Sequence, residues 1–461
     1  MPLNYINSKI LISLSLYILG FYATASLAFQ FTGKLWYIAP ILFLLVIILN
    51  AKIFLSKEYL LEIILINIFG IWSLFTSFWS LYPLVTIQRA LYFILIINTS
   101  FITSKILMKF SLSLYSILFP ILLFSVLISV FSLLINYPEN SWTGGNSYGF
   151  MGFTIHQNTL GSLILFTIPS ILLFHFKATS DKKSIVKKTS NISKLFFWFL
   201  FLTAITILLF THSRASILSL TLFFLLLSLF LHFRVALVSL FVFLIICIGT
   251  FILFPKAAQY IKSYLTKNSQ SLFDSRIYLW KTSYQSAFGG GWAGIGYGIS
   301  HPYFKNNFGN NRSENGRFIR EKGNSFLAII EETGIIGFIL FLVPIIFIFK
   351  KSIKVYSQQF NIYSLHNNRS IKHYNNKFTS RFSLLTFKNF RLPFHLSRLT
   401  YKVSSVSPST FHCSLFTLHL FFLISIIVHS QFEAWMTSVA SFQVLIYYLL
   451  ISSLIVSKEK I

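Results

Sequence analysis

The sequence predicts an all-α polytopic membrane protein with about twelve transmembrane helices and one large outer loop. Of its 461 residues, 55% are hydrophobic and only 11% carry a charge. Apolar runs of roughly 16 to 25 residues recur along nearly the whole chain, and each is about long enough to cross a hydrocarbon core of about 30 Å as a helix. The runs are continuous rather than alternating, which favours helices over a β-barrel.

The expected spans follow these runs in order. They are residues 10–29, 36–55, 59–78, 84–103, 112–136, 159–176, 195–210, 215–231, 235–254, 324–349, 411–429 and 435–456. The first run ends in ATASLAFQ, whose small residues resemble a signal-peptidase site. Because eleven further spans follow, we expect an uncleaved first helix instead.

The basic residues predict the orientation of these spans. The loop at 177–194 carries six lysines against Asp181 alone, and short loops rich in lysine and arginine stay in the cytoplasm. Counting spans from this loop places both termini in the cytoplasm. The formal charge of +27 is therefore an indicator of topology, and we expect no nucleic-acid partner.

The chain divides into five regions. We expect spans one to nine in 1–254, a large periplasmic loop in 255–323, the tenth span in 324–349, a basic cytoplasmic insert in 350–410, and the last two spans with the tail in 411–461. The insert has eleven Lys or Arg and no Asp or Glu, which predicts a poorly ordered segment at anionic lipid headgroups. The glycine-rich stretch at 287–300 predicts a flexible loop, with a lid as the functional alternative.

Charged residues gather toward the expected outer face. Arg214 lies in THSRASILSL at the start of a helix, and Arg276 lies in DSRIYLW, four residues before Trp280. An arginine at a helix end can extend to the headgroups, or it can bind a phosphate through two hydrogen bonds. Two arginines facing one compartment favour a diphosphate, since its negative charge exceeds what one guanidinium neutralises.

Two glutamates and a third arginine lie at membrane depth or near it. Arg89 is inside the fourth span, Glu332 is about two turns into the tenth, and Glu433 precedes the last span. Charged side chains at this depth are costly and usually have a functional role. The glutamates are therefore candidate counter-ions for Arg89 or candidate bases. The sequence contains no D-x-D, HExxH, GxSxG or Walker motif, so we expect no metal site and no cofactor.

The order of the motifs resembles the O-antigen polymerase and ligase superfamily. The matching elements, in chain order, are WSLYPLVTIQRA at 79–90, IHQNTLG at 155–161, SRAS at 213–216, R-x-x-x-W at 276–280, G-x-G-x-G at 294–298 and N-S-F-L-x-x-x-x-E-x-G-x-x-G at 324–337. The resemblance covers roughly residues 75 to 340. It implies a GT-C-like glycosyltransferase at the outer face of the bacterial inner membrane, whose partners are the bilayer, sugars linked to undecaprenyl pyrophosphate, and a chain-length regulator as a further candidate.

The resemblance also implies roles for individual residues. Arg214 and Arg276 take the places of the two arginines that grip the pyrophosphate, and Asn158 and Asn324 belong to the matching motifs. The family commonly has a histidine directly before that second asparagine, proposed as base, where this chain has Gly323. His301 is a candidate replacement, with Glu433 or Glu332 as the fallback.

The missing histidine favours a polymerase, because it is prominent among ligases. A ligase that transfers polysaccharide to the lipid A core is the alternative. A transporter of lipid-linked sugars is the competing class, but transporters usually show related halves and charges near the midplane.

Overall fold

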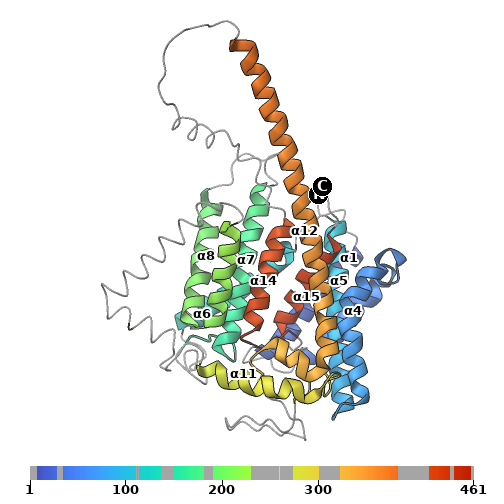
Figure 1. Ribbon diagram of the computed structural model, residues 1–461. Helices are drawn as coiled ribbons and strands as arrows, with labels where there is room; N and C mark the ends of the chain where they lie inside the picture. Colours follow the sequence, from blue (N-terminus) through green and yellow to red (C-terminus); the bar gives the residue numbers. More distant parts are fainter. Residues whose placement is uncertain are drawn as a thin grey trace.

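The computed structural model describes residues 8–28, 35–110, 112, 114–135, 149–180, 191–229, 259, 274–300, 322–382, 415–433, 435–436 and 441–457. Within these residues the protein is all-helical, as the apolar runs predict (Figure 1). The amino-terminal part contains α1 (Ser8–Ala25), η2 (Ser26–Ala28), η3 (Leu35–Tyr37), α2 (Ala39–Leu49), α3 (Ala51–Phe54), η4 (Lys57–Tyr59), α4 (Leu60–Phe75), η5 (Thr76–Phe78) and α5 (Pro83–Lys109).

The remaining elements complete the bundle. They are α6 (Tyr115–Ile135), α7 (Gln157–Ser180), α8 (Asn191–Phe210), a helix at Arg214–Leu229 called here the 214–229 helix, α11 (Asp274–Ala287), η7 (Phe288–Gly290), α12 (Ser325–Phe382), α14 (Leu415–Ser430) and α15 (Phe442–Val456).

Five helices are long and apolar enough to cross a membrane. They are Ser8–Ala25, Lys57–Phe78, Pro83–Lys109, Ile117–Ile135 and Ser325–Lys354, and six shorter apolar helices accompany them. Every expected span other than 235–254, which lies outside the described residues, coincides with an apolar helix. The count of twelve spans stays a prediction.

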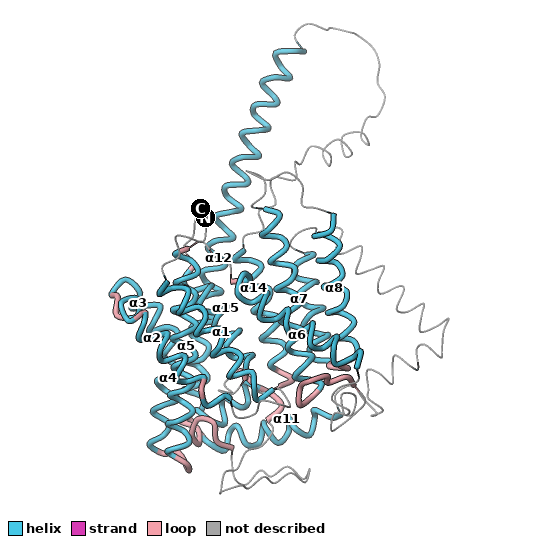
Figure 2. Tube along the Cα trace, turned by 180° about the vertical axis from the view of Figure 1, so that it is seen from behind, coloured by secondary structure: helices cyan, strands magenta, loops and turns pink. Residues whose placement is uncertain are grey.

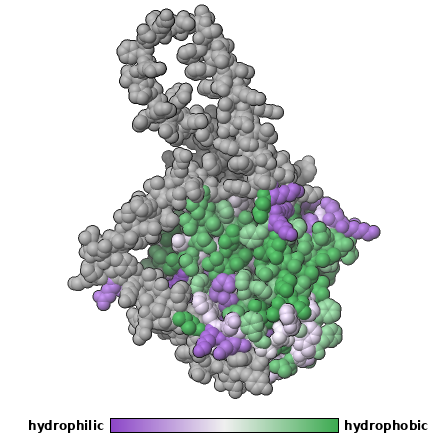
Figure 3. Space-filling view, in the orientation of Figure 1, coloured by the Kyte–Doolittle hydropathy of each residue, from purple (hydrophilic) through white to green (hydrophobic). Residues whose placement is uncertain are grey.

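Large apolar side chains cover much of the outside of the bundle. Figure 3 shows them as a broad band between more hydrophilic patches, and Leu84, Leu134 and Leu195 are 82%, 78% and 73% exposed. Soluble proteins rarely expose apolar patches of this extent. With the apolar helices, this surface identifies a multi-pass membrane protein.

The core lies around α5. This helix packs against α1, α2, α4 and α15, and its residues from Ile96 to Leu107 are all buried. Helices α6, α7 and α8 form a second group, beside which α14 lies (Figure 2). Buried apolar side chains of both groups belong to one continuous core.

The two ends of the bundle differ. Helix α11 lies across one end, while the start of α1 and the end of α15 lie at the other (Figure 1). The start of α1 and the end of α15 thus share the end of the bundle opposite α11. Which compartment each end faces stays a prediction.

Helix α12 extends past the bundle at the end opposite α11 (Figure 1). It continues to Phe382, so the expectation of a poorly ordered insert is wrong for residues 350–382. The reason is local: no glycine or proline occurs between Pro344 and Pro393 to stop the helix. The rest of the insert lies outside the described residues.

Candidate functional site

Helix α12 is broken at Gly334, about two and a half helical turns after its start at Ser325. Gly334 has φ 72° and ψ −176°, which no helix contains. The break frees the carbonyl oxygens of the preceding turn, and inside a membrane such groups must find partners within the protein. Trp72 of α4 supplies one, since its indole Nε1 donates to the Thr333 carbonyl at 2.8 Å.

The other partners come from a segment called here the glycine loop, residues 291–300. The amide of Ile295 donates to the Glu331 carbonyl at 3.1 Å and the amide of Gly296 donates to the Glu332 carbonyl at 2.9 Å. Gly294 has φ 77°, and a Cβ there would lie 2.5 Å from the Glu332 carbonyl oxygen. The flexible-loop expectation is therefore wrong for 291–300, because the chain is fixed by these bonds to the break in α12.

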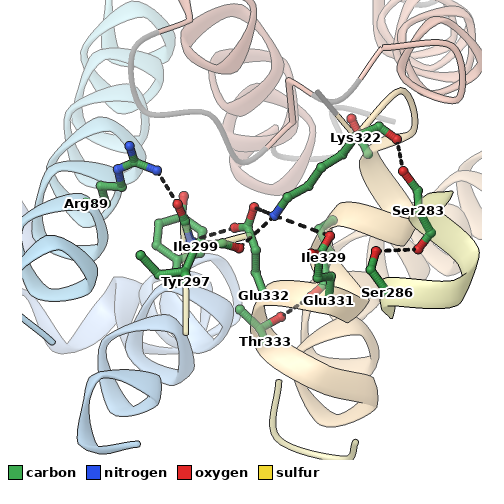
Figure 4. A network of polar contacts seen from close by, with 12 residues as sticks. Arg89, Ser283, Ser286, Tyr297, Ile299, Lys322, Ile329, Glu331, Glu332 and Thr333 are labelled. Atoms are coloured by element: carbon green, nitrogen blue, oxygen red, sulfur yellow. Dashed lines mark hydrogen bonds and ion pairs between the residues drawn. The ribbon is translucent and has the colours of Figure 1, made fainter. Parts of the chain in front are cut away.

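A buried ion cluster lies beside this break (Figure 4). The Lys322 ammonium contacts Glu332 Oε1 at 2.5 Å and Glu331 Oε2 at 3.7 Å, and it donates to the Ile299 carbonyl at 2.9 Å. The ammonium thus makes two hydrogen bonds, to Glu332 and to the Ile299 carbonyl, and a longer ion pair with Glu331. All three charged side chains are buried, so each depends on the others for its charge to be tolerated.

Glu332 was expected to pair with Arg89 or to act as a base. Instead, its second oxygen accepts the Gly298 amide at 2.7 Å, while Arg89 donates to the carbonyl oxygen of the same glycine. The ion-pair partner of Glu332 is Lys322. Arg89 and Glu332 are thus joined through one glycine residue rather than directly, and both oxygens of Glu332 are engaged.

Tyr297 fills the space between the glycine loop and the bundle. Its ring is fully buried against Phe69 and Phe93, and its amide donates to Thr76 Oγ1 at 2.9 Å. Burial, with a smaller contribution from Glu332, raises the pKa of the phenol well above its usual range. The ring therefore stays neutral and adds no charge to the cluster.

Gly323, where the family commonly has histidine, adopts a left-handed conformation. Its φ is 65°, and a Cβ would lie 3.0 Å from Leu279 Cβ on α11. Trp280 Nε1 donates to its carbonyl oxygen at 3.2 Å, and Ser283 Oγ donates to the carbonyl oxygen of Lys322. The positive φ and the close approach of the Leu279 side chain both disfavour a larger residue at this turn, which gives a physical reason for the glycine.

Asn324 and Ser325 join α12 to the turn after α14. Asn324 Oδ1 accepts the amides of Phe326 and Leu327 at 2.9 and 3.1 Å, which caps the helix, and its Nδ2 donates to the Gln431 carbonyl at 3.1 Å. Ser325 Oγ donates to the Glu433 carbonyl at 2.9 Å. The turn that carries Glu433 is thereby fixed to the start of α12.

Arg214 begins the 214–229 helix, directly after a turn of buried polar residues. Ser213 Oγ lies 2.9 Å from Ser216 Oγ, and Ser216 Oγ lies 3.1 Å from His429 Nε2 on α14. Gly161 of α7 lies against this turn, where a Cβ would be 2.7 Å from Ser213 Oγ. The IHQNTLG and SRAS motifs are therefore neighbours in space.

Asn158 lies in the first turn of α7, in the same IHQNTLG motif. The backbone N–H of Asn158 donates to His156 Nδ1 at 3.1 Å, so the histidine side chain caps the helix. Asn158 lies about one turn before Gly161, the residue of this motif that contacts the Arg214 turn.

The remaining site residues are only partly described. Arg276 lies on α11, one turn before Trp280, but its side chain and the whole of His301 lie outside the described residues. Trp280 packs its ring against Phe432, with centroids 5.7 Å apart. Trp280 thus contacts the turns at 323 and 432 from α11.

Sequence reasoning missed Lys322, Glu331 and His429. Two adjacent glutamates inside an apolar run require a nearby cation, which indicates that a partner exists but not that the partner is Lys322. In the part of the chain that the structure describes, no group of three or more His, Cys, Asp or Glu side chains could hold a metal ion.

Comparison with known proteins adds one match. Residues 199–342 match a family model described as O-antigen ligase. The matched region includes the 214–229 helix, α11, the glycine loop and the broken start of α12. No curated protein and no solved structure matches the chain. The resemblance carried by the motifs is thus confirmed over residues 199–342, the part of the chain that is similar to the O-antigen ligase family.

Proposed function

We propose that this protein is a glycosyltransferase that joins oligosaccharide repeat units carried on undecaprenyl pyrophosphate, at the periplasmic face of the bacterial inner membrane. The observation that carries the proposal is the O-antigen ligase match over residues 199–342. That region holds both Arg214 and Arg276.

The proposed reaction is a displacement at the anomeric carbon of the donor sugar. A hydroxyl of the acceptor sugar forms the new C–O bond, the bond to the diphosphate breaks, and undecaprenyl pyrophosphate leaves with the electron pair. Arg214 and Arg276 bind the diphosphate and stabilise its growing charge. Fixed cations at this position contribute most of the catalysis, and the reaction needs no metal ion.

The rigid surroundings of Arg214 support this assignment. Hydrogen bonds connect its helix to α14, the turn after α14 to α12, and the start of α12 to α11. A charged site is effective when the elements that carry it are held in place before the substrate arrives. The chain of contacts provides this rigidity from residues far apart in the sequence.

The acceptor hydroxyl must lose a proton. Glu332 is engaged on both oxygens by Lys322 and the Gly298 amide, so its role is structural. Glu433, on the turn fixed by Ser325, and His301 are the two candidate bases. The proton passes to one of them as the new bond forms.

The acceptor distinguishes polymerase from ligase. We propose a polymerase, because Gly323 replaces the histidine that is prominent among ligases. A deletion strain separates the two by the lipopolysaccharide it makes. Cores capped with single repeats indicate a lost polymerase, whereas bare cores with accumulated lipid-linked polymer indicate a lost ligase.

The chemistry is tested with purified protein in detergent and a lipid-linked repeat unit. We expect longer chains to form without any ion gradient, an outcome that a transporter cannot give. Arg214→Ala and Arg276→Ala should each lower the rate about a hundredfold or more. Lys281→Ala is the matched control, because Lys281 is an exposed cation on α11. Full activity in both arginine variants at normal expression contradicts the proposal.

A further inference from the structure

His429 lies in the last turn of α14 and is completely buried. Its ring lies between two polar side chains from other segments. Trp435 Nε1 lies 3.0 Å from His429 Nδ1, and Ser216 Oγ lies 3.1 Å from His429 Nε2. Both ring nitrogens are therefore engaged, so this histidine is not available to take a proton from a substrate.

The two contacts fix the tautomer of the ring. An indole N–H is a donor only, so Nδ1 must be the acceptor and carry no proton. The neutral imidazole then has its proton on Nε2 and donates it to Ser216 Oγ. Ser216 in turn contacts Ser213, 2.9 Å away. The histidine thus sets the direction of the hydrogen bonds in the turn that precedes and begins the 214–229 helix.

The same contacts connect that turn to the other half of the site. Trp435 is bonded to His429 through its indole and to Ser325 Oγ through its backbone amide, at 3.1 Å. Ser325 also accepts the Met436 amide at 3.2 Å. One imidazole therefore joins the first turn of the 214–229 helix to the start of α12.

We propose that His429 is a positioning residue for the anion site at Arg214. Ser216 lies in the same helical turn as Arg214, so the bond from His429 fixes the backbone that presents the guanidinium. The identity of the anion as a diphosphate rests on the proposed function. His429 itself does not touch the substrate.

The test measures binding of inorganic pyrophosphate to the purified full-length protein, together with transfer from a lipid-linked repeat unit. His429→Phe keeps the ring volume and removes both nitrogens, and it should weaken pyrophosphate binding about tenfold, as the loss of two hydrogen bonds implies. His429→Gln keeps one donor and one acceptor and should restore most of the affinity.

The chain offers a matched control on the same helix. His419 is buried on α14 with its ring 5.1 Å from Tyr115, and its Nε2 has no hydrogen-bond partner among the described residues. His419→Phe makes the same chemical change in the same helix. It should leave pyrophosphate binding and transfer unchanged.

Ser216→Ala removes the same hydrogen bond to His429 Nε2 with a smaller change in the side chain. The test therefore does not depend on whether His429→Phe folds. Ser216→Ala should weaken binding as His429→Phe does, and the double variant should lose little more than either single one. Additive losses, or a folded His429→Phe protein that binds pyrophosphate like wild type, overturn the proposal. So does wild-type protein that binds no pyrophosphate.

The result also separates this inference from the proposed function. Wild-type protein that transfers no sugar contradicts the proposed function. If that protein nevertheless binds pyrophosphate, and His429→Phe weakens the binding while His419→Phe does not, the positioning role stands.

Discussion

Lys322 and Glu332 form an ion pair at 2.5 Å across the entry turn of α12, with both side chains buried. Lys322 joins the glycine loop to α12, because its ammonium also donates a hydrogen bond to the Ile299 carbonyl. A lysine that appears in the sequence as one of many loop cations is therefore the counter-ion of the two acids at the break. Removing it leaves two buried carboxylates without their cation.

Lys322→Met should destabilise the protein by about 3–5 kcal/mol, the usual cost of leaving a buried charge without its partner. The measurement is the midpoint of thermal unfolding in detergent. Lys281→Met, on the exposed face of α11, is the control and should leave the midpoint unchanged. Adding Glu332→Gln to Lys322→Met should recover part of the loss, and the absence of any recovery contradicts the pairing.

Gly334→Ala should destabilise the protein more than Gly291→Ala does. Both glycines have positive φ, 72° and 63°, with ψ of −176° and −145°, a backbone region that is essentially reserved for glycine. Alanine at either position therefore costs about 1–3 kcal/mol of backbone strain. At Gly334 a Cβ would also overlap the Trp292 carbonyl oxygen, whereas at Gly291 it would meet nothing within 4 Å. The difference between the two unfolding midpoints isolates the packing of the glycine loop on the break, and equal midpoints contradict it.

The helices could be predicted from the sequence because an apolar segment in lipid must satisfy its backbone hydrogen bonds within itself, which a helix does. Runs such as 84–103 and 324–349 contain enough consecutive apolar residues to require a helix, and α5 and α12 cover both. The expectation of a poorly ordered insert was wrong at 350–382. A polar, basic composition indicates that a segment is exposed to water, but it does not prevent the segment from forming a helix. There the absence of glycine and proline decided the structure.

The site was less predictable because its contacts are set by the path of the chain. Glu332 was correctly singled out as an acid that needs a partner, but the sequence contains no signal that favours Lys322 over Arg89. The choice depends on how the glycine loop enters the break at Gly334. His429 gave no signal, because its role arises from two partners, Ser216 and Trp435, that are 213 and 6 residues away.

Substitution of the three candidate bases should separate structure from chemistry. Glu332→Gln is expected to lower the unfolding midpoint, with activity falling only as folded protein is lost, because both carboxylate oxygens are engaged. His301→Ala and Glu433→Gln should differ from each other. Substitution of the residue that accepts the proton should lower kcat of the enzyme about 10²–10⁴-fold. The measurement is the initial rate per folded enzyme, and the unfolding midpoints are the control. Comparable full activity in both variants excludes a base at either position.

Gly323→His, which restores the residue common in the family, should lower stability and activity rather than raise them. The position has φ 65°, and a Cβ there would lie 3.0 Å from Leu279 Cβ, so histidine adds about 1–2 kcal/mol of backbone strain and displaces α11. Displacing α11 also moves the backbone that carries Arg276, so transfer should fall further than the loss of folded protein explains.

Gly323→Asn separates strain from bulk at this position, since asparagine tolerates positive φ better than most residues. It should be the milder of the two variants in both unfolding midpoint and transfer rate. A histidine variant as stable as wild type and more active would mean that the Leu279 side chain can move aside, and that its close approach does not require glycine at position 323.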